Sequence, residues 1–351
     1  MDVAPNASPM RTLAITWEDH RRTRELCDGL QLPLHVLAFG GNRWMRYIRL
    51  GLSTVQLLLR ARPAVLFLQT PSVALAMIAV LLRPFCGRYR IIMDAHNEAV
   101  TPYTYTQWPV PQLHRFTIRS ADLTIVTNPA LVAVIDKIGG QAFVLPDRLP
   151  ATPIEHASFP EALTPFRVMV VATYAADEPI AEIIEAARLL GSEYEFRITG
   201  RETKLPAEQR ARLPRNVIQT GFLSEHDYWV LMNENHAVLD FTLKPNCLVC
   251  GAYEGLALLR PMILSDNEAT VALFGRVAVF PASHTAKAIA EAVRACRGRH
   301  GELVRAAADE KPRFARNWDE QAVHLKKLIS DWGRGNSSSA TLRRQRAQSR
   351  T

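Results

Sequence analysis

The chain has 351 residues, a formal net charge of +8, 48% apolar residues and 22% charged residues. The length favours two domains, because one domain usually spans roughly 100–200 residues, and the composition excludes a disordered chain. Residues 333–351 contain five arginines and no acid, so much of the excess charge lies in what we predict to be a disordered basic tail. The tail could contact anionic lipid or nucleic acid, but we favour a flexible, solvated end and expect no nucleic-acid partner.

In residues 1–150, apolar strands alternate with amphipathic helices. The alternation predicts a parallel sheet covered on both faces, whose ligands bind beyond the carboxyl ends of the strands. Five prolines in 145–165 break the pattern, and we place a linker at 151–165. We expect strands at 13–16, 34–38, 64–69, 90–93 and 123–127, and helices at 20–30, 44–60, 73–82 and 112–120.

The same alternation restarts in residues 166–312. An amphipathic helix at 313–332 and the tail at 333–351 complete the chain. The fold class expected is therefore α/β, with two Rossmann-like, doubly wound parallel-sheet domains. We expect strands at 166–172, 195–199, 217–220, 237–241, 262–265 and 277–280, and helices at 179–190, 226–233, from near 251 to before 261, and 286–297.

Neither the cysteines nor the apolar runs indicate export or a membrane span. The five cysteines are scattered and odd in number, which is typical of reduced thiols in the cytosol. The first twelve residues lack the apolar core of a signal peptide. The most apolar run, Val73–Leu82, is far shorter than the roughly 20 residues that cross a bilayer. We therefore expect a cytoplasmic protein.

The most informative segment runs from the strand at 237–241 through a turn-rich loop into the helix that begins near Gly251. The first N–H groups of a helix have no intrahelical partners and its dipole attracts negative charge, so this helix start is a natural anion site. Glu254 lies about one turn inside the helix, where a carboxylate can accept hydrogen bonds from hydroxyls. A diphosphate next to a sugar diol predicts a bound sugar nucleotide.

Several other site chemistries have less support. The chain lacks both the glycine-rich motif of a dinucleotide-binding strand and the P-loop of an NTPase. Cys247 and Cys250 have the spacing of half a zinc site or of a redox pair, but no second pair completes a zinc site. Thiol redox chemistry at the helix start stays open, and we favour two small side chains that line a phosphate loop.

A loop dense in charge follows the first strand. Glu18, Asp19 or His20 could serve there as a general base, and the arginines of residues 21–24 could hold phosphate. The alternative is a capped and solvated first helical turn.

A second polar loop follows the strand at 90–93. Asp94 is a further candidate base or a residue that orients His96, and His96 could bind a sugar hydroxyl or a phosphate. The alternative is a helix cap beside a packed histidine.

The helix expected at 44–60 is basic as well as apolar. Five arginines in Arg43–Arg62 are interleaved with aromatic and aliphatic side chains. The pattern suits the surface of an anionic membrane, and a core helix with a basic solvent face is the alternative.

Short motifs along the chain resemble those of a known enzyme family. The motifs are Arg167–Pro179, Ile198–Arg201, Gly221–Leu223, Ala252–Glu254 with Pro261, Gln69–Ser72 and Asp94–Asn97. On these motifs the second half resembles the nucleotide-sugar domain of GT-B glycosyltransferases of the family 4 group, and the first half is similar to the beta-mannosyltransferases that extend lipid-diphosphate-linked chitobiose. The fold implied is two Rossmann-like domains that face an interdomain cleft.

The resemblance also implies roles for individual residues. Glu254 matches the carboxylate that holds the ribose hydroxyls, and Thr173 and Arg201 lie in loops after donor-domain strands. The final helix resembles one that crosses back to the first domain. Phe222 and Leu223 match the loop that faces the base, and Lys244, Asn246, Cys247, Leu248 and Val249 match the loop over the diphosphate and the donor sugar.

Two departures from the family pattern concern charge. Asn246 stands where the family usually has a second glutamate, and 177–179 replaces a segment that usually carries a lysine. We expect Lys244, Arg201, the 21–24 arginines and unpaired N–H groups at the Gly251 helix to neutralise the leaving diphosphate instead. No metal ion or other cofactor is expected.

The function implied is transfer of a hexose from a GDP- or UDP-linked sugar to a saccharide acceptor, in exopolysaccharide or cell-surface glycan synthesis. A polyprenyl-diphosphate-linked acceptor would place the protein at the inner face of the plasma membrane. The alternatives are a catalytically inactive GT-B subunit that binds a partner transferase, and a nucleotide-sugar epimerase or phosphorylase.

Overall fold

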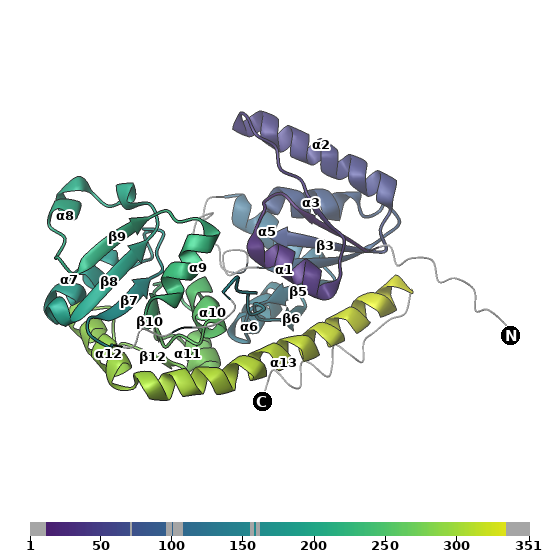
Figure 1. Cartoon of the computed structure of the whole chain (residues 1–351). Helices are drawn as coiled ribbons and strands as arrows, with labels where there is room; N and C mark the ends of the chain where they lie inside the picture. The colour runs from purple at the N-terminus through teal and green to yellow at the C-terminus, as the bar shows by residue number, and fades with distance from the viewer. Residues whose placement is uncertain are drawn as a thin grey trace. The chain divides into compact units, whose positions relative to one another are not determined.

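The computed structural model describes residues 12–70, 72–95, 100, 108–154, 158 and 162–334. The chain divides into two compact units (Figure 1): Met1–Arg148 with Asn317–Thr351, and Leu149–Arg316. In the described residues each unit holds one sheet of six strands, and all the strand pairs are parallel.

The sheet of the first unit has the strand order β2-β1-β3-β4-β5-β6. The chain runs from β1 out to β2 and then returns to β3 on the other side of β1, so the strand order reverses between β1 and β3. The strands are β1 (Thr12–Thr16), β2 (Leu34–Val36), β3 (Val65–Thr70), β4 (Arg90–Ala95), β5 (Leu123–Val126) and β6 (Ala142–Val144), and the helices are α1 (Arg21–Leu30), α2 (Arg43–Ala61), α3 (Val73–Leu82), α5 (Val110–Ser120) and α6 (Ala130–Ile138).

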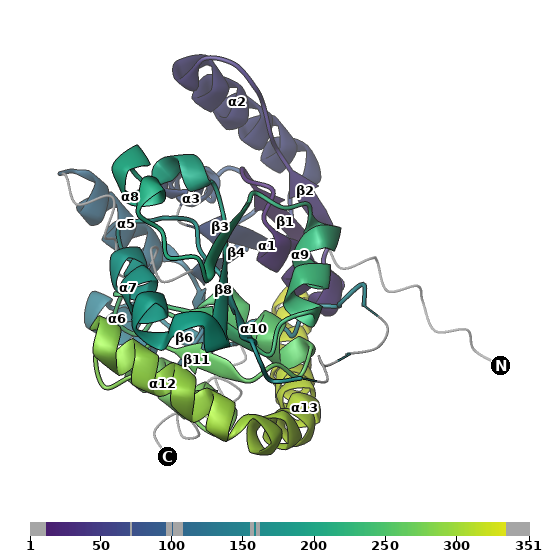
Figure 2. The same ribbon diagram turned by 60° about the vertical axis from the view of Figure 1, so that its left-hand side comes forward.

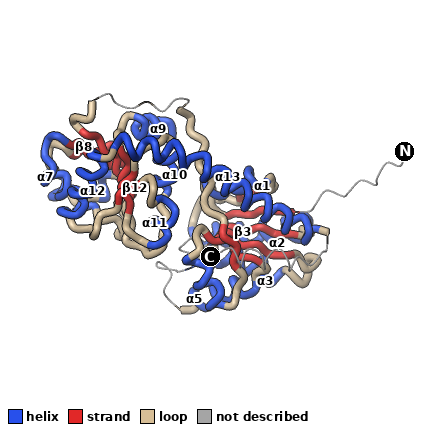
Figure 3. Tube along the Cα trace, turned by 90° about the horizontal axis from the view of Figure 1, so that it is seen from below, coloured by secondary structure: helices blue, strands red, loops and turns tan. Residues whose placement is uncertain are grey.

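Helices cover both faces of this sheet because alternate strand residues point to opposite sides. Phe67 packs with α1 and with the C-terminal part of α13 (His300–Gly333), which supplies Trp318. Its neighbours Leu66 and Leu68 pack on the other face with α2 and α3. Figure 3 shows α1 and α13 on one side of the strands of this unit and α3 on the other.

The sheet of the second unit has the order β12-β11-β10-β7-β8-β9. The chain builds outward from β7 to β9 and then returns to β10 beside β7, so the order reverses between β7 and β10. The strands are β7 (Phe166–Val170), β8 (Tyr194–Thr199), β9 (Val217–Gly221), β10 (Ala237–Asp240), β11 (Met262–Leu264) and β12 (Ala278–Val279), and the helices are α7 (Ile180–Leu190), α8 (Ala207–Ala211), α9 (Glu225–Asn233), α10 (Cys250–Ala257), α11 (Glu268–Phe274) and α12 (Ala286–Gly298), with 3-10 turns η1 (Gly191–Glu193) and η2 (Glu202–Lys204).

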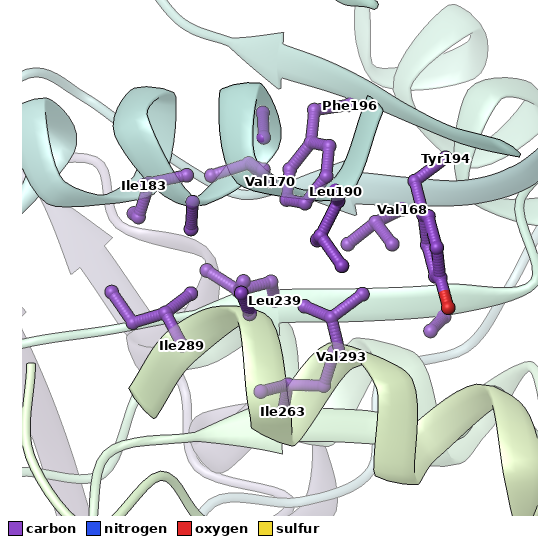
Figure 4. Packing of buried hydrophobic residues seen from close by; sticks show 14 of the residues in the cluster. Val168, Val170, Ile183, Leu190, Tyr194, Phe196, Leu239, Ile263, Ile289 and Val293 are labelled. Carbon is purple, nitrogen blue, oxygen red and sulfur yellow. The ribbon is translucent and has the colours of Figure 1, made fainter. Parts of the chain in front are cut away.

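The largest core cluster of this unit lies between the sheet and the pair α7 and α12 (Figures 2 and 4). Val168 and Leu239 point from the strands toward Ile183 of α7 and Val293 of α12. The other face of the sheet is packed with α9, α10 and α11, whose contacts include Met169 with the helices that follow β9 and β10. Both faces of the central strands are therefore buried, as parallel sheets require.

The predicted fold class is confirmed, and the differences concern short elements. The sequence pattern did not predict α6, β6, α8 or α11, and the helix expected at 313–332 is the C-terminal part of α13, which begins at His300 and continues through Pro312. Residues 335–351 of the expected tail, and parts of the expected linker, lie outside the described residues.

Candidate functional site

The carboxyl edge of the second sheet carries the donor-site candidates. Open α/β sheets bind ligands where the strand order reverses, which in this unit is the end of β7 and β10. The loop after β7 holds Thr173, the loop after β10 holds Lys244 and Asn246, and α10 follows directly with Glu254. The topology therefore brings these sequence-predicted residues to one edge of one unit.

The loop after β7 is closed by a carboxylate. Glu178 accepts hydrogen bonds from the backbone N–H of Thr173 at 2.9 Å, from the Thr173 hydroxyl at 2.7 Å and from the N–H of Ala175 at 3.2 Å. The Nζ of Lys204 donates to the carbonyl oxygen of Thr173 at 2.6 Å. Glu178, which stands in the segment where the resembled family carries a lysine, thus shapes the loop.

A second carboxylate joins the loops after β7 and β10. Asp177 accepts a 2.7 Å hydrogen bond from the Thr242 hydroxyl, and its carbonyl oxygen accepts one of 2.8 Å from the N–H of Leu243. Its carboxylate also lies 3.6 Å from Nζ of half-buried Lys244. Lys244, the one positively charged residue of the loop after β10, therefore lies at the point where the strand order reverses.

The start of α10 differs from our expectation. The N–H of Gly251 donates to Oδ2 of Asp240 at 2.9 Å, so it is not one of the unpaired groups that we expected to meet a diphosphate. A Cβ at position 251 would lie 2.6 Å from the same oxygen, which explains why a glycine is needed there. Burial raises the pKa of Asp240 well above its ordinary value, and the hydrogen bond from Gly251 partly opposes this rise.

Glu254 is buried and has a partner that the sequence did not indicate. The phenol of Tyr228, on α9, donates a 2.5 Å hydrogen bond to Oε2 of Glu254. Burial, followed by the negative charge of Glu254, raises the pKa of Tyr228 well above its usual range. The only available sequence signal was a tyrosine within a mostly apolar helix, and this signal is common to many packed helices.

The loops after β8 and β9 present an aromatic ring beside a cation. Phe222 is 79% exposed, and the guanidinium of Arg201 lies 5.9 Å from the centre of its ring. Gly200, at φ +94°, donates its N–H to the carbonyl oxygen of Gly221 at 3.1 Å and thereby joins the two loops. An exposed ring of this kind offers a flat face for stacking, and Leu223 follows it, half-buried.

The rest of the loop after β10 is partly buried. Asn246 has a φ of +52°, a left-handed conformation that asparagine tolerates better than most residues. Leu248 and Val249 pack against the cluster around α10. Cys247 is half-buried and Cys250, at the start of the helix, is exposed. The second half of the loop is therefore anchored to the core, and the first half carries Lys244.

In the first unit, three of the candidate bases follow β1. The Thr16 hydroxyl bonds to Gln69 and to the carbonyl oxygen of Glu18, the latter at 2.6 Å, which ties this loop to the end of β3. Asp19 pairs with Arg24 at 2.5 Å, and this hydrogen bond lowers the pKa of Asp19. The carboxylate of Glu18 is exposed and makes no ion pair with a described residue, and His20 lies directly before α1.

Asp94 occupies a different environment. It is fully buried and forms a 3.0 Å ion pair with Arg22, which also contacts Asp147. Arg22, one of the arginines expected to hold phosphate, is therefore committed to two carboxylates of its own unit. His96 and the side chain of Arg21 lie outside the described residues.

Two negative findings apply to the described part of the chain. None of its helices reaches the length and hydropathy that crossing a bilayer demands. Among the same residues, no group of three or more His, Cys, Asp or Glu side chains is placed to hold a metal ion.

Comparisons with known proteins connect this chain to others through its structure. No protein-family model matches the sequence, and no curated protein matches it. Anabaena HepE, crystallised with UDP and glucose, superposes with a TM-score of 0.69 at 13% identity, covering 92% of this chain and 98% of HepE. A putative UDP-N-acetylglucosamine 2-epimerase from Listeria monocytogenes gives 0.63 at 11% identity, with coverage of 93% and 97%.

A glycosyltransferase from Rickettsia africae gives a TM-score of 0.62 at 9% identity, covering 91% of this chain and 98% of that protein. At such identities the likeness concerns the fold alone. Together with the two parallel sheets and their strand orders, it establishes that the chain has the two-domain α/β fold of the GT-B class.

Proposed function

We propose that this protein is a glycosyltransferase that moves a hexose from a nucleoside-diphosphate sugar to a saccharide acceptor. The observation that carries the proposal is the carboxyl edge of the second sheet, where Lys244, Arg201 and Phe222 lie on loops at the strand ends. Glu254 lies on α10, directly after one of these loops. HepE, which shares the fold, was crystallised with UDP and with UDP-glucose. This favours a uridine donor over a guanosine donor.

Each part of such a donor has a chemically suitable partner. The base stacks on the exposed ring of Phe222, and the ribose hydroxyls donate to the carboxylate of Glu254. Lys244 and Arg201 supply positive charge to the diphosphate, whose negative charge grows as the bond to the sugar breaks. In this proposal no metal ion is required.

The acceptor hydroxyl must lose a proton when it forms the new glycosidic bond. Of the three carboxylates proposed as the base, Asp94 is paired with Arg22 and Asp19 with Arg24. Glu18 is exposed, and its carboxylate has no ion-pair partner among the described residues. Glu18 is therefore our choice for the general base of an inverting transfer.

We further propose that the acceptor saccharide is carried on a lipid diphosphate, as the resemblance to the beta-mannosyltransferases suggests. The enzyme would then act as a peripheral protein on the cytoplasmic face of the membrane and contribute to an exported polysaccharide. The family 4 assignment and the hexose remain part of this proposal.

An epimerase is the second candidate, because a putative UDP-N-acetylglucosamine 2-epimerase shares the fold. The two activities differ in their requirement for an acceptor. An epimerase would convert its nucleotide sugar in the absence of any acceptor, and the product would keep the nucleotide. A transferase would release the nucleoside diphosphate.

The test is a thermal-shift screen of UDP- and GDP-linked sugars, followed by measurement of nucleoside diphosphate release. A donor at 100 times its dissociation constant stabilises the folded protein by about 2.7 kcal/mol. We expect at least one UDP-sugar to do so, and Glu254→Gln to abolish the shift. Glu234→Gln, an exposed residue on the C-terminal cap of α9, is the control. Absence of binding and of diphosphate release across the panel would refute the proposal.

A further inference from the structure

Positive charge is concentrated in one part of the first unit. Residues 29–93 contain eight arginines and no aspartate or glutamate. Five of the eight lie on α2 or directly after it, and they are Arg43, Arg46, Arg49, Arg60 and Arg62. The segment has no acid of its own. Arg83 and Arg90 pair with Asp122, which lies outside it, whereas the arginines of α2 form no ion pair with a described residue.

The same helix is apolar on two opposite faces. Leu50 and Leu58 are buried against the first sheet. Trp44, Ile48 and Leu52 follow one another at the four-residue spacing of a helix face and are 79%, 57% and 65% exposed. At about 100° per residue, Leu52 points roughly 200° away from Leu50. One apolar face therefore holds the helix to its unit, and the other is exposed.

The exposed face has a basic margin. Arg46, Arg49 and Arg60 lie at angles between the exposed apolar face and the buried one, and all three are exposed. In Figure 1, α2 lies at the outer margin of the first unit with α3 beneath it. A stripe of large apolar side chains next to guanidinium groups is the arrangement of helices that lie in a membrane interface.

We propose that the exposed face of α2 is a docking surface for a membrane that contains anionic phospholipid. Trp44, Ile48 and Leu52 enter the boundary between headgroups and acyl chains, while the arginines bind lipid phosphates. Charge complementarity selects this partner. A second copy of the chain would bring two arginine-rich surfaces together, and like charges in contact disfavour association.

The loop with the proposed base is attached to the same helix. Nε1 of Trp17 donates a 3.0 Å hydrogen bond to the hydroxyl of Thr54, on α2. The rings of Trp17 and Tyr47, also on α2, pack edge to face with their centres 5.9 Å apart. Glu18 is the next residue. If the proposed function holds, the docked helix supports the loop that meets a lipid-linked acceptor, but docking itself does not depend on that activity.

The experiment measures sedimentation of the full-length protein with lipid vesicles in the absence of any nucleotide sugar. Vesicles of phosphatidylcholine alone are compared with vesicles in which about one third of the lipid is phosphatidylglycerol. The two test variants are the apolar triple Trp44→Ser, Ile48→Ser, Leu52→Ser and the charge triple Arg46→Gln, Arg49→Gln, Arg60→Gln. Each arginine near an anionic surface contributes about 1 kcal/mol, so the charge triple should bind about 100-fold more weakly.

Matched controls remove the same number of groups from other exposed positions. Leu189→Ser, Val271→Ser, Val323→Ser replaces three exposed apolar residues, and Arg215→Gln, Arg294→Gln, Arg305→Gln lowers the net charge equally. Both controls should bind like the wild type, and the apolar test triple should bind about tenfold or more weakly. All variants should keep the melting temperature of the wild type, because only surface side chains change.

Three outcomes would overturn the proposal. The first is equal binding to neutral and anionic vesicles, and the second is undiminished binding of both test variants. The third is a wild-type protein that does not bind vesicles but forms a dimer in analytical ultracentrifugation, which the apolar triple converts to a monomer. Because no donor is present, the vesicle experiment tests membrane docking whether or not the chain is a transferase. Failure of the proposed function would appear only in the nucleotide-sugar screen.

Discussion

The phenol of Tyr228 and the carboxylate of Glu254 share a 2.5 Å hydrogen bond between α9 and α10. This bond holds one oxygen of a buried carboxylate against a side chain of the neighbouring helix. Tyr228 is thus a positioning residue for the ribose site that we propose.

Tyr228→Phe should therefore weaken donor binding without abolishing it. A hydrogen bond to a charged group contributes about 1.5–3 kcal/mol, so the dissociation constant should rise by roughly 10-fold or more in calorimetric titration. Tyr89→Phe is the control, because it also removes a buried tyrosine hydroxyl, which donates to the carbonyl oxygen of Ala79 in the first unit. Equal losses of affinity in the two variants would show that Tyr228 has no specific role.

Glu18→Gln should separate catalysis from donor binding. Removal of a general base typically lowers the rate about 100-fold or more, so kcat should fall while the donor dissociation constant stays unchanged. Asp19→Asn, which breaks the exposed pair with Arg24, should have a much smaller effect on kcat. A larger loss in Asp19→Asn than in Glu18→Gln would reverse the assignment.

Local sequence patterns predicted the sheets well but did not indicate the contacts between the candidate site residues. Continuous apolar runs are a strong signal for buried parallel strands, which is why the positions of β3 and β7 were predicted closely. The β6 strand of three residues, Ala142–Val144, was missed because so short an apolar run has no distinctive period.

The missed features of the site depend on pairs of residues distant in sequence. Arg22 and Asp94 are separated by 72 positions, and Tyr228 and Glu254 by 26. Neither contact can be predicted from the sequence around one of its residues, since only the strand order brings the two residues together. The same holds for Asp240, whose bond to Gly251 removes a helix N–H that the sequence alone suggested was available.

Gly251→Ala should disturb the donor site through Asp240. The added Cβ would lie 2.6 Å from Oδ2 of Asp240 and 3.0 Å from the side chain of Val171. Overpacking of this kind costs about 1–3 kcal/mol, and urea denaturation should show it together with weaker donor binding. Gly298→Ala is the control, because no atom lies within 4 Å of its Cβ position at the end of α12. Equal stability of the two variants would contradict this account.

Gly29→Ala should show whether the end of α13 is an integral part of the first unit. A Cβ at position 29 would overlap the indole ring of Trp318, which belongs to the same core cluster as α1. We expect a loss of about 1–3 kcal/mol in the free energy of unfolding. Gly51→Ala, whose Cβ would meet Ile78 at an ordinary 3.6 Å, should be neutral or slightly stabilising because alanine favours helix. A neutral Gly29→Ala would mean that Trp318 does not pack there in solution.

His236 should make the folded protein less stable in mild acid. Its Nδ1 accepts the N–H of Arg167 at 2.8 Å, so the neutral ring carries its proton on Nε2, which lies 3.0 Å from the carbonyl oxygen of Ala162. Burial, and then the neighbouring His300, lower the pKa of His236 to about 4. A second proton on the ring would remove the acceptor for Arg167.

The direction of the pH dependence follows from proton uptake. In the unfolded chain His236 has a pKa of about 6.5, so between about pH 6.5 and 4 the unfolded state binds a proton that the folded state excludes. The free energy of unfolding is therefore highest above that range and falls as the pH drops, by up to about 1.4 kcal/mol per pH unit. Urea titrations across this range give the free energy of unfolding at each pH. In His236→Gln this free energy should fall less steeply with falling pH, by up to about 1.4 kcal/mol per pH unit, whereas exposed His226→Gln should show the pH dependence of the wild type. An unchanged slope in His236→Gln would assign the acid sensitivity to other groups, of which His114, whose pKa burial also lowers to about 4, is the first to test.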